Sequence, residues 1–139
     1  MIFDTHAHYD DEQFDTDREV LLLGMAEQNV GTIINVGASL DGCWRSVELA
    51  HQYPFVYAAV GVHPDEVGDL NDQTFARLRE TARTEEKVVA IGEIGLDYHW
   101  DVQPTKCSST GLYSRWIWQK SWICRSRYTA AMRQKIPLI

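Results

Sequence analysis

The 139-residue sequence contains no apolar run that approaches the ~20 residues needed by a membrane-spanning helix. Its first residues lack the basic and apolar regions of a secretory signal peptide. Cysteine is scarce, and Cys43, Cys107 and Cys124 are too widely spaced to form a disulfide framework or a zinc knuckle. These absences predict a protein of the reducing cytoplasm that does not associate with membranes.

Acidic residues are missing from residues 105–139, although the chain as a whole carries a net charge of −7. All 20 acidic residues lie in residues 1–104, together with only six of the 13 basic residues. Residues 105–139 contain the other seven basic residues, three of the five tryptophans and two of the three cysteines. So abrupt a change has three possible explanations: a basic tail that binds nucleic acid, a divergent end of the protein, or a reading-frame error.

Glycine-rich phosphate loops of the dinucleotide or P-loop type follow none of the predicted strands. What is present is a regular alternation of strand and helix patterns. Strand patterns occupy residues 1–5, 31–37, 55–62 and 88–96. Helix patterns occupy residues 14–29, 41–52 and 74–84, the last with Thr74 as a candidate N-cap. Strands rich in Val, Ile and Ala predict a parallel sheet buried on both faces, and the repeated unit predicts an α/β fold, doubly wound or barrel.

Polar residues follow the C-terminal end of every predicted strand. His6 and His8 follow the first strand, Asn35 ends the second, His63 the third and Glu93 the fourth. Active sites of (β/α)₈ barrels are assembled from residues at strand C-termini. The arrangement therefore favours the barrel.

The segment Asp4-Thr5-His6-Ala7-His8 is a candidate metal-binding motif. Side chains alternate along a strand, so His6 and His8 point the same way and lie close together. Two neutral imidazoles in that geometry can hold a divalent cation. The alternative is that one of them is an ordinary buried histidine of the core.

Glu93 follows an apolar strand, where a carboxylate is costly unless it is paired or bound to a metal. It could bridge two metals, complete a site with His6 and His8, or form a buried ion pair. Gly92 and Gly95 beside it allow close approach of a ligand or of backbone. Asp97 fits a supporting or capping role better than that of a ligand.

The remaining histidines carry weaker signals. His63 could contact substrate or a ligand carboxylate, or could be a polar turn residue. His51 lies in a predicted helix and is expected on the surface. His99 lies in a predicted loop, where contact with substrate is an option.

Three separated motifs occur in order: Asp4-Thr5-His6-Ala7-His8, Gly61-Val62-His63-Pro64 and Gly92-Glu93-Ile94-Gly95-Leu96-Asp97-Tyr98. Residues 1–104 thereby resemble the TatD family of metal-dependent deoxyribonucleases, within the amidohydrolase-like barrels. The resemblance implies the first four β/α units of a (β/α)₈ barrel, a two-metal centre that uses Mg²⁺, Mn²⁺ or Zn²⁺, and DNA as the substrate. It also implies that His6 and His8 bind one metal, and that Glu93 bridges both metals.

Relatives of this family are about twice as long and supply two further histidines and an aspartate from later strands. This sequence has no histidine after His99 and no aspartate after Asp101. The resemblance therefore predicts an incomplete barrel. For the chain as written, we expect weak binding of a single metal and little or no nuclease activity.

A single-base frameshift near Pro104–Lys106 accounts for the change in composition. When each codon is read from the third base of the preceding residue, Trp116-Ile117 and Trp122-Ile123 each force aspartate, and Trp118-Gln119 forces alanine. A consistent choice at the freer positions gives an amphipathic acidic helix and a strand ending in Ile-His-Ser-Arg-Asp-Ala. Both resemble the family's next helix and its next strand, which carries a ligand histidine. We predict that residues 105–139 are read out of frame.

Two other functions remain open on the sequence. An amidohydrolase-type enzyme acting on C–N or ester bonds would share His6, His8 and the barrel. A non-catalytic half-barrel could instead bind nucleic acid through the basic residues and tryptophans of residues 105–139. However, the pattern around Trp116 and Trp122 has neither helix nor strand periodicity.

Overall fold

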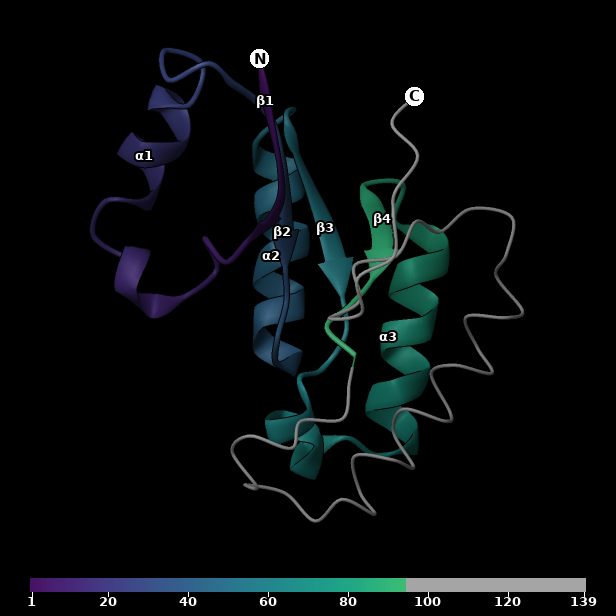
Figure 1. Ribbon diagram of the computed structural model, residues 1–139. Helices are drawn as coiled ribbons and strands as arrows, with labels where there is room; N and C mark the ends of the chain where they lie inside the picture. Colours follow the sequence, from purple (N-terminus) through teal and green to yellow (C-terminus); the bar gives the residue numbers. More distant parts are fainter. Residues whose placement is uncertain (95–139) are drawn as a thin grey trace.

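The structure is a computed structural model that describes residues 1–94 (Figure 1). The described part alternates strands and helices, as the sequence predicts. In chain order its elements are β1 (Ile2–Ala7), the 3₁₀ helix η1 (Glu12–Phe14), α1 (Arg18–Gly24), β2 (Val30–Val36), α2 (Leu40–Gln52), β3 (Val56–Val60), the 3₁₀ helix η2 (Pro64–Asp69), α3 (Asp72–Thr84) and β4 (Val88–Ile91). Within residues 1–94 no helix is both long and apolar enough to cross a membrane.

The four strands form one parallel sheet in the order β1-β2-β3-β4, which confirms the predicted α/β class. Each strand therefore pairs with the next one along the chain, as expected when helical connections carry the chain back to the start of the sheet. Helix α2 packs against β2 and β3, and α3 packs against β4 (Figure 1). Because the strands are parallel, the C-terminal ends of all four lie along the same end of the sheet.

The core lies on both faces of the sheet. In β3, Val56, Ala58 and Val60 belong to the large apolar cluster shared with the helices, whereas Ala59 belongs to a smaller cluster. Because strand side chains alternate between faces, the two clusters lie on opposite sides of the sheet. Burial on both faces is thus confirmed for β3, and β2 and β4 likewise contribute residues to both clusters.

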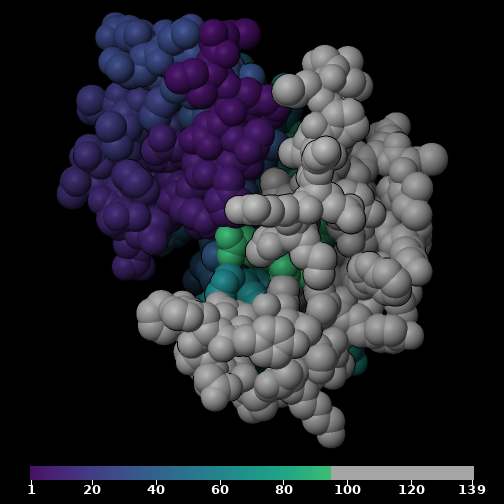
Figure 2. Space-filling view, viewed as in Figure 1, coloured from purple at the N-terminus to yellow at the C-terminus, as the bar shows by residue number. Residues whose placement is uncertain are grey.

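Strand β1 differs from the prediction of burial on both faces. Ile2 and Phe3 are 54% and 55% exposed. Figure 2 shows the N-terminal residues, in purple, on the outer surface of the molecule. The reason is position: β1 is an edge strand that pairs only with β2 among the described residues, so one side of it has no neighbouring strand there.

The first helical segment is shorter than predicted. In place of one helix over residues 14–29, η1 and the seven-residue α1 are separated by a turn. Arg18 explains the break, because its guanidinium binds the carbonyl oxygens of Tyr9 and Asp11 and the Asp15 carboxylate, which folds the preceding loop back. The apolar periodicity misled the prediction, since Val20 and Leu23 are exposed.

The third helix begins earlier than predicted, and its N-cap is Asn71 rather than Thr74. The Asn71 side chain accepts from the backbone N–H groups of Gln73 and Thr74, while the Thr74 hydroxyl accepts from Asn71 N at 2.9 Å. This is a reciprocal capping box in which threonine takes the place usually held by glutamate. The prediction of Thr74 as the N-cap is therefore wrong, although its side chain takes part in the cap from position N3.

Candidate metal centre

His6 and His8 lie next to each other at the C-terminal end of β1, as the alternation of strand side chains predicts. His6 is inside the strand and His8 directly follows its last residue, Ala7. Their Nε2 atoms are 3.1 Å apart, and their ring centroids are 4.9 Å apart in an edge-to-face arrangement. Neither histidine is buried in the core, so the alternative of an ordinary core histidine does not hold.

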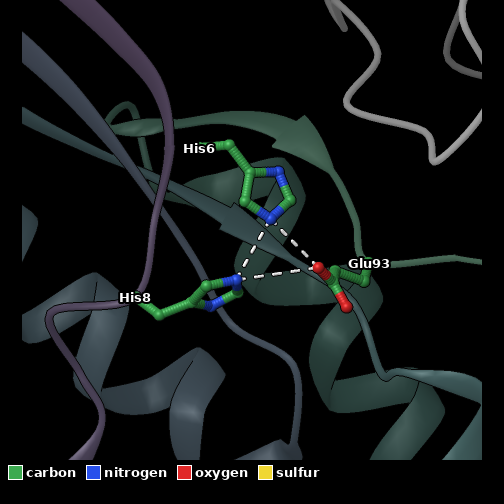
Figure 3. Close-up of side chains that lie close together, drawn as sticks. All are labelled: His6, His8 and Glu93. Carbon is green, nitrogen blue, oxygen red and sulfur yellow. Dashed lines mark hydrogen bonds and ion pairs between the residues drawn. The ribbon is translucent and has the colours of Figure 1, made fainter.

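Glu93 reaches the same point from the other edge of the described sheet. It follows β4, and its Oε1 atom is 3.1 Å from His6 Nε2 and 3.7 Å from His8 Nε2 (Figure 3). The ligand atoms of the three residues all lie within 4.8 Å of one another. Two imidazole nitrogens and one carboxylate oxygen thus face a common point. From here on, the cluster means these three residues, His6, His8 and Glu93.

This donor set fits a divalent cation. Tetrahedral coordination with bonds of about 2.0–2.1 Å places neighbouring ligand atoms about 3.3 Å apart. The separations of 3.1, 3.1 and 3.7 Å are close to that value. His8 Nδ1 lies 2.7 Å from the Val36 carbonyl oxygen, which can only accept, so Nδ1 carries the proton and the Nε2 lone pair faces the cluster.

His63 lies at the other oxygen of Glu93. It is the N-cap of η2, and its Nδ1 atom accepts from Asp65 N at 3.3 Å. Its Nε2 atom is 3.8 Å from Glu93 Oε2. Its Nδ1 atom also lies 3.5 Å from Asp65 Oδ2, so the ring stands between the carboxylates of Asp65 and Glu93. His63 is therefore both a helix cap and a neighbour of the candidate centre, so the two alternatives left by the sequence are not exclusive.

The backbone of Glu93 is held against two glycines. Glu93 N donates to the Gly37 carbonyl oxygen at 3.4 Å, and Gly92 N donates to Val60 O at 3.1 Å. A Cβ atom at Gly61 would collide with the Gly92 carbonyl group and with the Glu93 carbonyl oxygen. The Cys43 thiol reinforces the arrangement, because Sγ lies 2.8 Å from Gly61 O and 3.3 Å from Gly61 N. Only glycine at position 61 lets Glu93 lie where it does.

A cavity of about 580 Å³ opens beside the cluster and is lined by both His8 and Glu93. Its other described lining residues include five acids, namely Asp10, Asp11, Glu12, Asp41 and Glu66. Arg45 is the one basic residue among the described lining residues. Burial raises the pKa of the Asp10 carboxyl, while its hydrogen bond from Asn35 opposes that shift. A polyanion entering this cavity would therefore depend on bound cations and Arg45 to offset the acids.

Sequence reasoning missed Asp10 and Arg45. Asp10 is buried, although it is one of many acids in residues 10–19 and nothing in that run distinguishes it. Arg45 Nη1 donates to the Asp10 carbonyl oxygen at 3.1 Å, a contact between residues 35 positions apart. His51 is on the surface as predicted and pairs with Glu85 at 2.8 Å. Asp97 and His99 lie outside the described residues.

Comparison with known proteins shows the family to which the chain belongs. The family model described as "TatD related DNase" matches residues 3–117. The chain belongs to the TatD family. The match continues past residue 104, where the motif-based resemblance stopped.

Individual relatives agree with this assignment. The TatD-family chain is 44% identical over 104 residues to the uncharacterized metal-dependent hydrolase YabD of Bacillus subtilis, covering 75% of this chain and 40% of that protein. It is 36% identical over 98 residues to the 3'-5' ssDNA/RNA exonuclease TatD of Cronobacter turicensis, covering 70% and 37%. The crystal structure of YjjV, a TatD homolog from Escherichia coli, superposes with a TM-score of 0.81 at 31% identity, covering 93% of this chain and 49% of YjjV.

These matches confirm the predicted fold and the metal-dependent hydrolase family. The parallel α/β architecture of residues 1–94 corresponds to the N-terminal part of a TatD barrel. The TatD-family chain spans about half the length of YjjV and about 40% of the length of the curated relatives.

Proposed function

We propose that this chain carries the N-terminal part of the metal centre of a hydrolase that cleaves phosphodiester bonds in DNA. The observation that carries the proposal is the convergence of His6 Nε2, His8 Nε2 and Glu93 Oε1 at the C-terminal edge of a parallel sheet. Relatives named as metal-dependent hydrolases and as a 3'-5' ssDNA/RNA exonuclease support the substrate class.

In the intact, frame-restored enzyme His6 and His8 would hold one cation, and Glu93 would bridge it to a second. Glu93 suits that role because its two oxygens face different groups: Oε1 faces the histidine pair and Oε2 faces His63. Two imidazoles and a carboxylate suit Zn²⁺, Mn²⁺ or Mg²⁺. Bound cations of this kind polarise phosphoryl oxygens and lower the pKa of a bound water.

The protein residues then bind and orient the substrate. The His63 ring faces the site through Nε2, and a proton on that atom would let it donate to a phosphate or leaving-group oxygen. Arg45 supplies positive charge to the adjoining cavity. Among residues 1–94, His6, His8 and Glu93 are the one group of three or more histidine, cysteine or acidic side chains placed to hold a metal. We therefore propose that residues 1–139 bind a single cation weakly and cleave DNA little.

The out-of-frame origin of residues 105–139 is part of the proposal, and the forced aspartate and alanine codons support it. Sequencing the coding DNA across the codons for residues 100–110 should reveal the shift, with Ile-His-Ser-Arg-Asp encoded downstream in the alternative frame. A third frame that does not encode the acidic helix and this strand end would refute the frameshift.

The activity is tested on metal-stripped protein with a 3'-labelled single-stranded oligonucleotide and added Mg²⁺, Mn²⁺ or Zn²⁺. We expect the frame-restored chain to cleave DNA only with metal, and residues 1–139 to be at least about 100-fold slower, since even supporting groups of metal sites are worth 10–100-fold. Parallel assays use amide and ester substrates. Cleavage of these instead of DNA would indicate an amidohydrolase. Robust metal-dependent cleavage by residues 1–139 would contradict their proposed inactivity.

A deletion separates the nucleic-acid-binding alternative from the enzyme. A half-barrel that binds DNA through its basic tail predicts salt-dependent DNA binding that disappears when residues 105–139 are removed. The proposed enzyme fragment predicts no such loss. Electrophoretic mobility shifts at two salt concentrations distinguish the two outcomes.

A further inference from the structure

We propose that Asn35 is the positioning residue for the histidine pair, and that its buried carboxamide aims His8 at the metal. This inference rests on the proposed metal site and deepens it. Asn35 touches neither the cluster nor the substrate, and acts through the two residues that follow His8.

The Asn35 side chain is fully buried, and each of its polar atoms has a partner. Its Oδ1 atom accepts from Tyr9 N at 2.6 Å, and its Nδ2 atom donates to Asp10 Oδ1 at 2.7 Å and to Ser46 Oγ at 2.8 Å. The backbone N–H of Tyr9 can only donate, so the orientation of the carboxamide is fixed by its contacts.

Val36, the residue after Asn35, holds His8 directly through its carbonyl oxygen, which accepts from Nδ1 at 2.7 Å. Two consecutive residues of β2 thus bind three consecutive residues of the neighbouring segment: His8, Tyr9 and Asp10. The imidazole is fixed at the ring and the backbone is fixed just beyond it. Groups that bind the far side of a ligand histidine set its orientation and tautomer.

We call these contacts of Asn35 and Val36 with His8, Tyr9 and Asp10 the clamp. The clamp matters because the β1–β2 ladder is irregular where the histidines lie. The register of the pair shifts between Asp4 and Ala7, the stretch that contains His6, and Ala7 opposite Asn35 is the last pair. Regular ladder bonds therefore do not extend to His8. Instead, the contacts of Asn35 and Val36 fix the direction of the chain at this point.

The first test uses Asn35→Leu in the full 139-residue chain, with Ser46→Ala as the matched control. Leucine has a similar branched shape, but its two methyl groups cannot form the hydrogen bonds to Tyr9, Asp10 and Ser46. Alanine at position 46 removes one hydrogen bond of the same carboxamide and leaves the clamp. Mn²⁺ and Zn²⁺ affinities are measured by competition with a chromophoric chelator, after urea titration has shown that each variant is folded.

We expect Asn35→Leu to weaken metal binding 10–100-fold and Ser46→Ala to change it less than threefold. Long-range ¹H–¹⁵N spectra of the metal-free protein provide a second readout. The His8 ring should be a single Nδ1–H tautomer in the wild type and in Ser46→Ala, and a mixture in Asn35→Leu. Unchanged affinity and tautomer in Asn35→Leu, or an equal loss in Ser46→Ala, would overturn the inference.

A second pair of variants covers the case in which Asn35→Leu does not fold. Asp10→Asn and Asp10→Ala remove the same charge, but only asparagine keeps an oxygen that accepts from Asn35. We expect Asp10→Ala to bind metal at least tenfold more weakly than Asp10→Asn. Equal affinities would overturn the clamp. If the wild type binds no metal while His8 keeps its single tautomer, the metal proposal fails and the positioning of His8 stands.

Discussion

Replacing Glu93 by glutamine is expected to lower the affinity of the chain for a divalent cation by more than about 100-fold, because even residues that only support a ligand contribute 10–100-fold. Glutamine keeps the size of the side chain but replaces the charged carboxylate with a neutral carboxamide. Glu93 is partly exposed, so the fold should survive the change. Chelator competition with Zn²⁺ and Mn²⁺ measures the loss, and the urea midpoint verifies folding.

Glu85→Gln is the matched control for this experiment. It removes the same charge from the same residue type, but Glu85 pairs with His51 on the surface, away from the cluster. Its metal affinity should stay within about twofold of the wild type, since the interaction between exposed charges separated by more than a Debye length is largely screened. An equal loss of metal affinity in both variants would mean that net charge alone causes the effect of Glu93→Gln. It would contradict the role of Glu93 as a ligand.

The substitution Gly61→Ala is expected to destabilise the protein by about 1–3 kcal/mol, the usual cost of overpacking. It should also weaken metal binding. The added Cβ collides with the backbone of Gly92 and Glu93, and no flexible side chain is available to move aside. The backbone must shift, and Glu93 moves with it. Urea unfolding and chelator competition measure the two effects on the same samples.

Gly24→Ala serves as the comparison for Gly61→Ala. Gly24 is the last residue of α1, and a Cβ atom there meets no atom within 4 Å. Alanine at this helical position should leave stability unchanged or raise it by up to about 1 kcal/mol. If Gly61→Ala matched Gly24→Ala in both stability and metal affinity, the close approach at Gly61 would not be what holds Glu93.

Much of the sheet could be predicted from local sequence. The apolar, β-branched runs around Ile33, Val56 and Val88 locate the starts of three strands to within one residue, because a strand buried on both faces must be apolar throughout. The predicted end of the fourth strand at residue 96 is wrong, since β4 ends at Ile91. The meeting of His6, His8 and Glu93 followed from parallel strands whose C-terminal ends share one edge. The period-two spacing then put the two histidines on the same side.

The failures of prediction come from polar contacts that hydrophobic periodicity does not reveal, some local and some between distant residues. Helix α1 begins later than predicted because Arg18, its first residue, binds the preceding loop at Tyr9, Asp11 and Asp15. The burial of Asp10 depends on Asn35, 25 positions away. Polar residues of this kind look like surface residues until the fold supplies their partners, since only tertiary contacts satisfy a buried polar group.

We propose above all that His6, His8 and Glu93 hold a divalent cation. Anomalous diffraction from crystals grown with Zn²⁺, recorded on both sides of the zinc absorption edge, tests it most directly. We expect a zinc peak about 2.0–2.2 Å from His6 Nε2, His8 Nε2 and Glu93 Oε1. A peak bound elsewhere, or none at this point in zinc-saturated crystals, would contradict it.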